Sequence, residues 1–334
     1  MNLELEDVEV QIRETTRQFC RSEFSRESIR SMTDNSERPS SGLWKVLADQ
    51  GWFSLRTSED EGGAGLGPVA SWVLFFEVGR ALVPGPVLWS HLSASLLGAH
   101  SWMAAVREGR AIVSGAYQSG AGPVLIEDLD LADLILLVDD GHASLIEAKG
   151  VDARSRTSLD PTRTLSEITS VRGAEVVGDA DMAFRLISEG RLLVAAMAAG
   201  GAAAARDIAV QYAKDRRQFG RPIGSFQAVK HLCADMAVRA HGAESISMWA
   251  ALQCQTSGVE VGSRFVDQAT VVTSAACLDN ARSLIQVLGA MGYTWEHEAH
   301  LYLKRAHGSS VAFGGAIAAA DRVGQRLVTN RNVR

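Results

Sequence analysis

Three basic side chains stand directly before a turn, in a spacing that suits the binding of an anion. Lys214, Arg216 and Arg217 close a helical pattern, and Gly220 and Pro222 follow as stop and turn signals before the next helical pattern. A guanidinium pairs with phosphate through two parallel hydrogen bonds, and the backbone N–H groups at a helix start attract negative charge. The stretch therefore predicts an anion site. The alternative is a solvated corner whose cations answer the dipole of the preceding helix.

A second group with suitable residue types is Glu296, His297, Glu298 and His300. Metal-binding helices place two ligands at positions i and i+4 on one face. His297 and His300 are at i and i+3, the two glutamates project from other faces, and no cysteine joins them. We interpret the group as part of a helix that follows Thr294, with surface hydrogen bonds and no metal.

The composition narrows the class of protein. Of 334 residues, 46% are hydrophobic and 22% are charged, which is ordinary for a globular chain with a sizeable core. The net charge of −6 gives no reason to expect nucleic acid or an anionic membrane as a partner. No run of 18 apolar residues and no basic-then-apolar leader occurs, so we expect a soluble, cytoplasmic protein without membrane insertion. The scattered cysteines predict reduced thiols.

Hydrophobic periodicity changes twice along the chain. Apolar residues recur at helical spacing up to about residue 108, with Ser40 or Ser41 as the cap of a helix that ends before Gly51. Short apolar runs follow, and those at 134–138 and 143–148 predict a β-hairpin because a turn signal joins them. The pattern then becomes helical again. We therefore expect a mainly α chain with a small β domain, divided into residues 1–110 (N-terminal helical), 111–178 (middle β) and 179–334 (C-terminal helical bundle).

The last of these domains carries the longest helical patterns. We predict helices at about 184–215, at 226–257, at 263–291, just after Thr294 and at 311–329. Alanine and glycine crowd residues 195–205, which favours close approach of helices at the centre of a bundle.

Two stretches of this domain resemble the signatures of a known family. Residues 212–236 read YAKDRRQFGRPIGSFQAVKHLCADM, and residues 286–294 read QVLGAMGYT. Both are similar to the C-terminal signatures of the acyl-CoA dehydrogenase family. The resemblance implies that family's fold: an N-terminal helical domain, a middle β domain and a C-terminal four-helix bundle.

The resemblance also implies a cofactor, FAD, and the residues that contact it. Arg216, Gln218, Phe219, Gln286 and Gly289 match family positions that reach the adenine and pyrophosphate part of the flavin. In the family these groups act on the cofactor of the neighbouring subunit. Family members remove two hydrogens from an acyl-CoA, one as the alpha proton taken by a glutamate and one as a hydride taken by the flavin. That glutamate needs a dry pocket and a tuned pKa.

The sequence departs from the family where the flavin ring and the base belong. The middle domain lacks the family's Thr/Ser-Glu-Pro and Gly-Ser-Asp strand pair, for which residues 117–123 stand, and its Trp-Ile-Thr/Ser segment. One family position for the base falls at residues 313–315, which read Phe-Gly-Gly. The other directly precedes Arg191, where this chain has Gly190. Glu189 is turned from that position by about 100° around a helix, and it would serve if the helix began irregularly at Gly190. We assign no catalytic residue.

The chain thus retains the family's adenine and pyrophosphate positions and lacks its flavin-ring and base positions. In this it resembles the short subunit of heteromeric bacterial acyl-CoA dehydrogenases of steroid side-chain degradation. The resemblance implies a heterotetramer in which a longer, acyl-CoA dehydrogenase-like partner supplies the base and the flavin-ring site. It also implies an acyl-CoA substrate and, as the family's usual acceptor, an electron-transfer flavoprotein. Two alternatives stay open: a self-sufficient homomeric enzyme with Glu189 as base, and a flavin-free scaffold or binding protein on the same fold.

Overall fold

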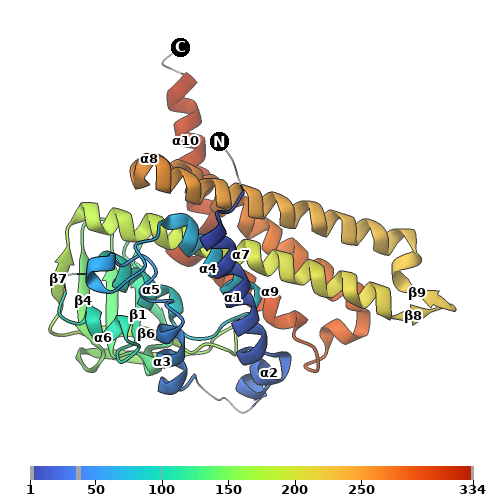
Figure 1. Cartoon of the computed structure of the whole chain (residues 1–334), viewed down its shortest axis with the longest axis horizontal. Helices are drawn as coiled ribbons and strands as arrows, with labels where there is room; N and C mark the ends of the chain where they lie inside the picture. Colours follow the sequence, from blue (N-terminus) through green and yellow to red (C-terminus); the bar gives the residue numbers. More distant parts are fainter. Residues whose placement is uncertain (1–3, 35–38, 99, 332–334) are drawn as a thin grey trace. The chain divides into compact units, whose positions relative to one another are not determined.

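Helices open and close the chain, and short strands occupy its middle (Figure 1). The structure is a computed structural model and describes residues 4–34, 39–98 and 100–331. It confirms the predicted fold class, a mainly helical chain with small β sheets between two helical parts.

The first helical part contains α1 (Asp7–Glu23), α2 (Arg26–Asp34), α3 (Ser41–Asp49), α4 (Pro68–Arg80), α5 (Val87–Leu96) and α6 (Met103–Arg107). The strands that follow are β1 (Val113–Tyr117), β2 (Leu125–Glu127), β3 (Leu134–Val138), β4 (Ala143–Glu147), β5 (Val151–Arg156), β6 (Leu165–Val171) and β7 (Glu175–Gly178). The last part contains α7 (Ala180–Asp215), β8 (Arg217–Gln218), β9 (Arg221–Pro222), α8 (Gln227–Leu288), α9 (Ala299–Ser309) and α10 (Gly315–Arg331).

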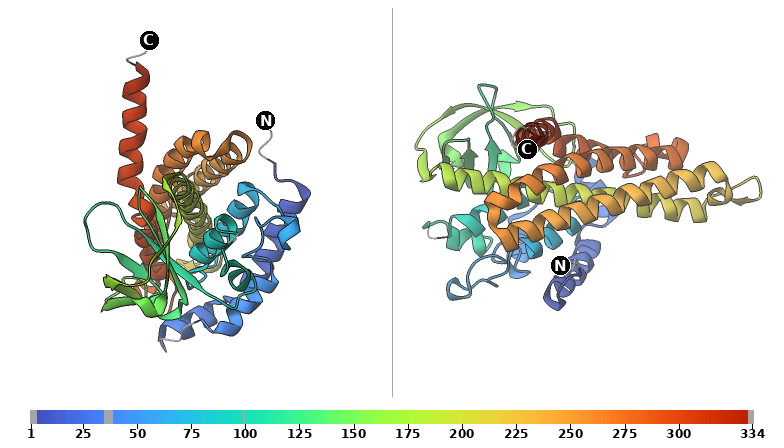
Figure 2. Two further views of the ribbon diagram at one scale, coloured as in Figure 1. Left: turned by 90° about the vertical axis from the view of Figure 1, so that its left-hand side faces the viewer. Right: turned by 90° about the horizontal axis from the view of Figure 1, so that it is seen from above.

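These elements form two compact units. The first contains residues 1–30, 72–83 and 192–334, and the second contains residues 31–71 and 84–191. The first unit contains α8 and most of α7, and these two long helices lie side by side (Figure 2). The helix α7 ends just before the β8–β9 hairpin, and α8 begins just after it.

Glycines let the backbones of α4 and α7 touch in the first unit. A Cβ atom on Gly79 would overlap the backbone of Met197, and one on Gly200 would overlap the carbonyl of Phe76. Larger side chains at either position would force the two helices apart. The alanine and glycine run at 195–205 therefore serves the close packing that its composition predicts.

The helix α8 joins two of the predicted helices into one element with a sharp break. Gly258 has φ +80° and ψ 163°, so the regular turn is interrupted there. Buried Asn280, after the break, donates to the carbonyls of Ala202 on α7 and Met236 before the break, each at 3.0 Å. Arg239 Nε in turn donates to the Asn280 side-chain oxygen at 2.9 Å. One amide thus fixes three helical segments against one another.

The second unit contains a four-stranded sheet in the order β1-β3-β4-β7 and a three-stranded sheet in the order β2-β6-β5. The strands β3 and β4 pair antiparallel with Leu134 opposite Glu147 and Val138 opposite Ala143, so the predicted hairpin is confirmed. The strand β1 runs parallel to β3. Strand β5 was not predicted because its pattern is polar and exposed, and polar exposed strands lack an apolar alternation.

Two helices, α3 and α7, begin at a side-chain cap. The side chain of Ser40 accepts from the N–H of Leu43 at 3.2 Å, which confirms the predicted cap of α3. The predicted start of α7 near residue 184 is wrong. The Asp179 carboxylate accepts from the N–H of Met182 at 3.1 Å, and the helix begins at Ala180.

The helix α7 is long and apolar enough to cross a membrane, with a mean hydropathy of 1.4 over its best 18-residue window. Of that window, 78% is buried inside the protein, so its apolar side chains already have protein partners. Within the described ranges, no other helix passes the same criterion.

Candidate functional site

The turn after α7 is a small, exposed β-hairpin. Arg217 pairs with Pro222 and Gln218 with Arg221 in an antiparallel ladder. Arg216 closes the base of this hairpin, because its carbonyl accepts from the N–H of Ile223 at 2.8 Å. The predicted turn is therefore a defined structure at the end of the helix pair, as Figure 1 shows on the right.

The tip of the hairpin holds an aromatic side chain in a strained conformation. Phe219 has φ +51° and Gly220 has φ +78°. Two positive φ values suit the tight turns that match the twist of a hairpin, but they are costly for a bulky residue. The Phe219 ring is 90% exposed, and it meets Phe226 edge-on with ring centres 6.0 Å apart. The Arg221 guanidinium lies 4.2 Å from the centre of the Phe226 ring. The tip thus presents a ring that is ordered yet uncovered.

The polar side chains of this segment face solvent without partners. Arg216 and Gln218 are both exposed, and neither side chain makes a hydrogen bond or an ion pair within the described part of the chain. Most arginines in this protein are paired, so an unpaired guanidinium beside an unpaired amide is a set of free donors. Such donors fit an anionic or polar ligand that comes from outside the chain.

The second predicted group lies at the carboxyl end of α8. Gln286 is exposed and has no side-chain partner among the described residues. Gly289 ends the helix with φ +61° and ψ −133°, a conformation that favours glycine. A Cβ atom there would meet nothing within 4 Å, so the backbone at Gly289 is open to a close approach. No hydrogen bond or ion pair joins this group to the hairpin within the described residues.

These observations are compatible with the part of FAD that the sequence predicts. A pyrophosphate takes charge-assisted hydrogen bonds from a guanidinium and requires open backbone, and an adenine takes a stacking ring and amide hydrogen bonds. Arg216, Gln218 and Gln286 supply polar side chains that have no hydrogen-bond or ion-pair partner within the described ranges. Phe219 supplies an exposed ring and Gly289 an open backbone. Their assignment to FAD stays a prediction.

Glu189 is held inside the protein by a cation. It lies in the first third of α7, is 3% exposed and forms an ion pair and hydrogen bond with Nη1 of Arg56. The helix is regular through Gly190, so the irregular start that would re-aim Glu189 is absent. Beside it, the guanidinium of Arg191 lies 5.8 Å from the centre of the Tyr117 ring. No local sequence pattern indicates the Arg56 contact, because 133 residues separate the two partners.

The other family position for the base has no acid. Phe313 stands there in a short 3₁₀ turn, Ala312–Gly314, and its ring is buried with 6% exposure. Phe313 has φ +51°, and the two glycines after it also have positive φ. The turn is therefore built around an apolar anchor.

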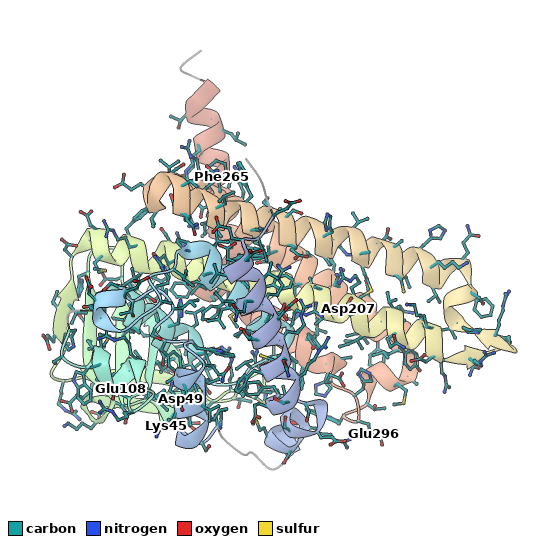
Figure 3. The ribbon with its side chains drawn as sticks, viewed as in Figure 1. Lys45, Asp49, Glu108, Asp207, Phe265 and Glu296 are labelled. Carbon is teal, nitrogen blue, oxygen red and sulfur yellow. The ribbon has the colours of Figure 1, made fainter. Side chains whose placement is uncertain are left out.

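The histidine and glutamate group has a different setting from the one predicted. Glu296, His297 and Glu298 precede α9, which begins at Ala299, so the prediction that they lie within a helix is wrong (Figure 3). The N–H of Ala299 donates to Nδ1 of His297 at 3.1 Å, so this histidine caps the helix start. Across the described ranges, no cluster of three or more His, Cys, Asp or Glu side chains has the arrangement of a metal site.

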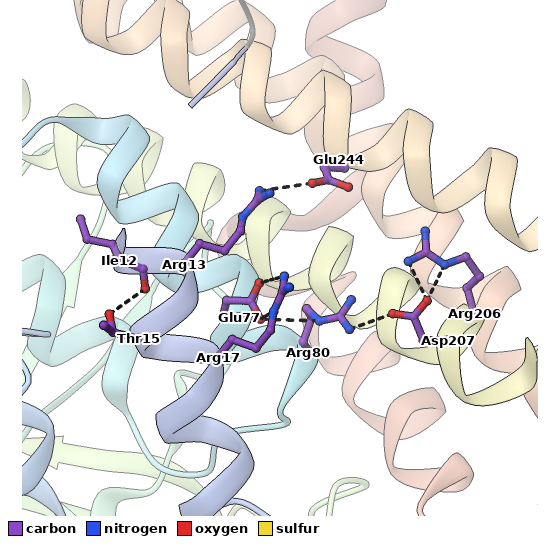
Figure 4. A network of polar contacts seen from close by, with 9 residues as sticks. All are labelled: Ile12, Arg13, Thr15, Arg17, Glu77, Arg80, Arg206, Asp207 and Glu244. Atoms are coloured by element: carbon purple, nitrogen blue, oxygen red, sulfur yellow. Dashed lines mark hydrogen bonds and ion pairs between the residues drawn. The ribbon is translucent and has the colours of Figure 1, made fainter. Parts of the chain in front are cut away.

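A charge network around the buried carboxylate of Glu77, in the first unit, was not predicted from the sequence (Figure 4). Arg17 donates to Glu77 through Nη2 at 2.6 Å and Nε at 3.0 Å, and Arg80 Nε lies 3.6 Å from the same carboxylate. Arg80 also donates to Asp207 at 2.8 Å, as does Arg206. Glu77 is 2% exposed. The available signal was a single carboxylate within the apolar stretch of α4, since a buried charge requires a partner.

Two family models match this chain. The C-terminal domain model of acyl-CoA dehydrogenase matches residues 180–327, and the N-terminal domain model of the same family matches residues 6–104. Together they include both predicted groups and the whole of α7, α8 and α9.

Whole-chain relatives carry the same family name. The chain is 32% identical over 308 residues to acyl-CoA dehydrogenase IpdE2 of Mycolicibacterium smegmatis, a match that covers 91% of this chain and 93% of that one. It is 35% identical over 311 residues to acyl-CoA dehydrogenase FadE34 of Mycobacterium tuberculosis, covering 86% of this chain but 43% of that longer protein.

A solved structure shows that the fold is shared over nearly the whole length. The structure named Tcur3481-Tcur3483 steroid ACAD, G363A variant, superposes with a TM-score of 0.86 and 22% identity. The match covers 98% of this chain and 99% of the other. With both terminal domain models and a full-length relative in agreement, this chain belongs to the acyl-CoA dehydrogenase family.

Proposed function

We propose that this chain is one subunit of an FAD-dependent acyl-CoA dehydrogenase made of two unlike chains, and that it completes the FAD adenine and pyrophosphate site of its partner. The observation that carries the proposal is the condition of the two base positions. Phe313 occupies one, and near the other the carboxylate of Glu189 is buried and neutralised by Arg56. A general base must reach the substrate and accept its proton, and neither residue meets that requirement.

The residues proposed to bind FAD are, in contrast, exposed. Arg216, Gln218, Phe219, Gln286 and Gly289 are exposed and open to a ligand. FAD, when bound, accepts a hydride from an acyl-CoA. In this proposal Arg216 holds a phosphate, the amides and the Phe219 ring position the adenine, and the open backbone at Gly289 lets the pyrophosphate approach. The partner supplies the base and the flavin-ring contacts.

Two of the relatives support a second chain. The name of the structural relative joins two proteins, Tcur3481 and Tcur3483. FadE34 is matched over 43% of its length, so more than half of that relative lies outside the region shared with this chain. A single polypeptide that holds one such region and at least as much chain again is what two fused subunits would give.

The substrate class follows from the family and from the same structural relative. We propose an acyl-CoA thioester with a bulky, ring-bearing acyl group such as a steroid side chain, because that relative is named a steroid ACAD. The complex would work in the cytoplasm and pass electrons to an electron-transfer flavoprotein. Within this proposal the domain boundaries remain those predicted, at residues 1–110, 111–178 and 179–334.

The test is to purify the complex with a candidate longer partner and replace Glu189 by Gln. The proposal predicts that acyl-CoA oxidation is retained, because the partner holds the base. Loss of turnover with the flavin still bound would identify Glu189 as the base and favour a self-sufficient enzyme. The matched replacement Glu298→Gln reports how much activity a glutamate removed elsewhere in the same chain costs.

A further inference from the structure

A recess of about 400 Å³ opens in the first unit where α1, α4, α7 and α9 meet. Its size falls within the range of small-molecule sites in proteins, roughly 300 to 1,000 Å³. It contains none of the five residues proposed for FAD.

The deep wall of the recess is apolar. It is formed by Cys20, Phe24, Ile29, Leu82, Ala204 and Ile208. Cys20, Phe24 and Leu82 are only 3 to 6% exposed, so the recess is narrow where it reaches them. Burial raises the pKa of the Cys20 thiol to about 12, which keeps the sulfur neutral and apolar at physiological pH. Hydrocarbon fits this wall, and a polar group would lose its hydration there.

At the opening of the recess, two arginines on one face of α1 have guanidinium N–H groups without a partner among the described residues. Arg17 and Arg21 are four residues apart on α1, so their side chains are neighbours. Arg17 donates to Glu77 through Nε and Nη2, and among the described residues its Nη1 has no hydrogen-bond partner. Arg21 is exposed, and within the described residues its guanidinium has no hydrogen bond or ion pair. Free guanidinium donors at an apolar opening suit a carboxylate.

Two of the three carboxylates that line the recess, Glu77 and Asp207, are paired with arginines. Glu77 is held by Arg17 and Arg80. Burial alone would raise the pKa of Asp207, but hydrogen bonds from Arg80 and Arg206 lower it below its usual value. Glu298, the third, lies 3.6 Å from Nδ1 of His297, but this nitrogen accepts from the N–H of Ala299 and is therefore no cation toward Glu298. The free positive charge is therefore concentrated on the α1 side.

One wall residue is held in a conformation that its type disfavours. Leu82 has φ +53°, in the left-handed region where glycine is usual at the end of a helix. The structure enforces it: Arg305 donates to the carbonyls of Leu82 and Val83, and the Tyr302 hydroxyl donates to the carbonyl of Arg80 at 2.8 Å. Strain of this kind accumulates at ligand sites, and here the leucine side chain forms part of the recess wall.

We propose that this recess binds a small amphipathic carboxylate, with its hydrocarbon body against the apolar wall and its carboxylate on Arg21 and the free Nη1 of Arg17. A neutral molecule of the same length has the hydrocarbon but not the anion. The recess therefore distinguishes a free acid from an alcohol or an ester of equal size. This site adds to the proposed function and does not depend on it.

The test is isothermal titration calorimetry of the full-length chain with sodium decanoate at submicellar concentration, and with 1-decanol as the neutral match. Saturable binding of one decanoate per chain is expected, with decanol about tenfold weaker. Ile208→Trp places a larger side chain on the apolar wall, which reduces the space for a ligand, and should abolish binding. Arg21→Gln should weaken decanoate about tenfold and leave decanol unchanged, because it removes the charge alone.

Arg185→Gln is the matched control, since Arg185 is exposed and lies outside the recess. It should bind decanoate as the unaltered chain does. Thermal unfolding of each variant confirms that it is folded, and replacing exposed Arg21 breaks no side-chain hydrogen bond or ion pair within the described residues. Absence of saturable decanoate binding overturns the proposal. Equal affinity for decanol, or unchanged affinity in folded Arg21→Gln, overturns it as well.

Discussion

The exposure and pairing of polar side chains differ between the hairpin after α7 and the Glu189 site earlier in the same helix. At the hairpin, Arg216 and Gln218 are exposed and have no hydrogen-bond or ion-pair partner in the part of the chain that the structure describes, and the Phe219 ring is exposed. Around Glu189, the carboxylate is buried and Arg56 neutralises it. An unpaired polar group on a surface costs little and is available to a ligand, whereas a buried pair is stable only while both members remain. The hairpin is therefore suited to binding an external ligand, whereas the Glu189 carboxylate already has its partner within the chain.

The largest effect on stability should come from removing the cation that pairs with Glu189. Arg56→Leu leaves Glu189 buried without a cation, which should destabilise the chain by about 3–5 kcal/mol. Urea unfolding measures the change. The double variant Arg56→Leu, Glu189→Leu removes both charges and should recover most of the loss, because two apolar side chains can pack in place of a buried pair. Equal loss in the single and double variants would show that the pair is not what the site depends on.

A second buried polar group predicts a pH dependence. Burial lowers the pKa of His91 from its ordinary 6.5 to about 4, while the hydrogen bond of Nδ1 to the carbonyl of Trp52, at 2.7 Å, acts in the opposite direction. Nε2 faces the Ser71 hydroxyl at 2.9 Å. Between these two values the unfolded chain binds a proton that the native chain does not. Stability should therefore fall as the pH is lowered from about 6.5 to 4, by about 3 kcal/mol in total.

Chemical unfolding at several pH values separates this contribution from that of the carboxylates. The slope between pH 6.5 and 4 should be shallower in His91→Gln than in the unaltered chain, since the titrating group is gone. His231 is exposed and lies outside the core, so His231→Gln should leave the slope as it was. An identical slope in the His91 variant would contradict the assignment.

At the hairpin, replacement of a charged side chain should weaken ligand binding and leave the stability of the fold nearly unchanged. Arg216→Gln removes a guanidinium without a partner, so stability should change by less than about 0.5 kcal/mol. If Arg216 holds a phosphate of FAD, the complex with the partner should bind FAD about tenfold more weakly, because a charge-assisted contact is lost. Fluorescence titration of released flavin measures the affinity, with Arg185→Gln as the control. Unchanged flavin affinity would remove Arg216 from the proposed site.

The smallest effect concerns the strain at the hairpin tip. Phe219→Gly fits the positive φ without cost but loses the edge-on contact with Phe226. The two effects oppose each other, so the melting temperature should change little, by an amount equivalent to about 1 kcal/mol or less. Flavin affinity should nevertheless decrease, since the exposed ring is gone. A marked loss of stability with unaltered flavin affinity would make Phe219 a structural residue.

The contrast also explains what the sequence could predict. The residues of the β8–β9 hairpin lie close together in sequence, and glycine at position 220 marks the turn. Local signals were therefore sufficient to predict a turn there. The β3–β4 hairpin was predictable for the same reason, through the turn signal at 139–141. The Arg56–Glu189 pair joins residues 133 positions apart, and nothing in either neighbourhood indicates the other. The start of α7 was missed although Asp179, a common cap residue, stood in the sequence.

The most direct test of the account is the flavin content of this chain alone and of its complex with a longer acyl-CoA dehydrogenase-like partner. Absorbance of the bound flavin gives the ratio of FAD to protein, and native mass spectrometry gives the assembly. The account predicts a colourless single chain and a yellow complex with about one FAD for every two chains. A single chain that carries one FAD per subunit and oxidises an acyl-CoA would contradict it.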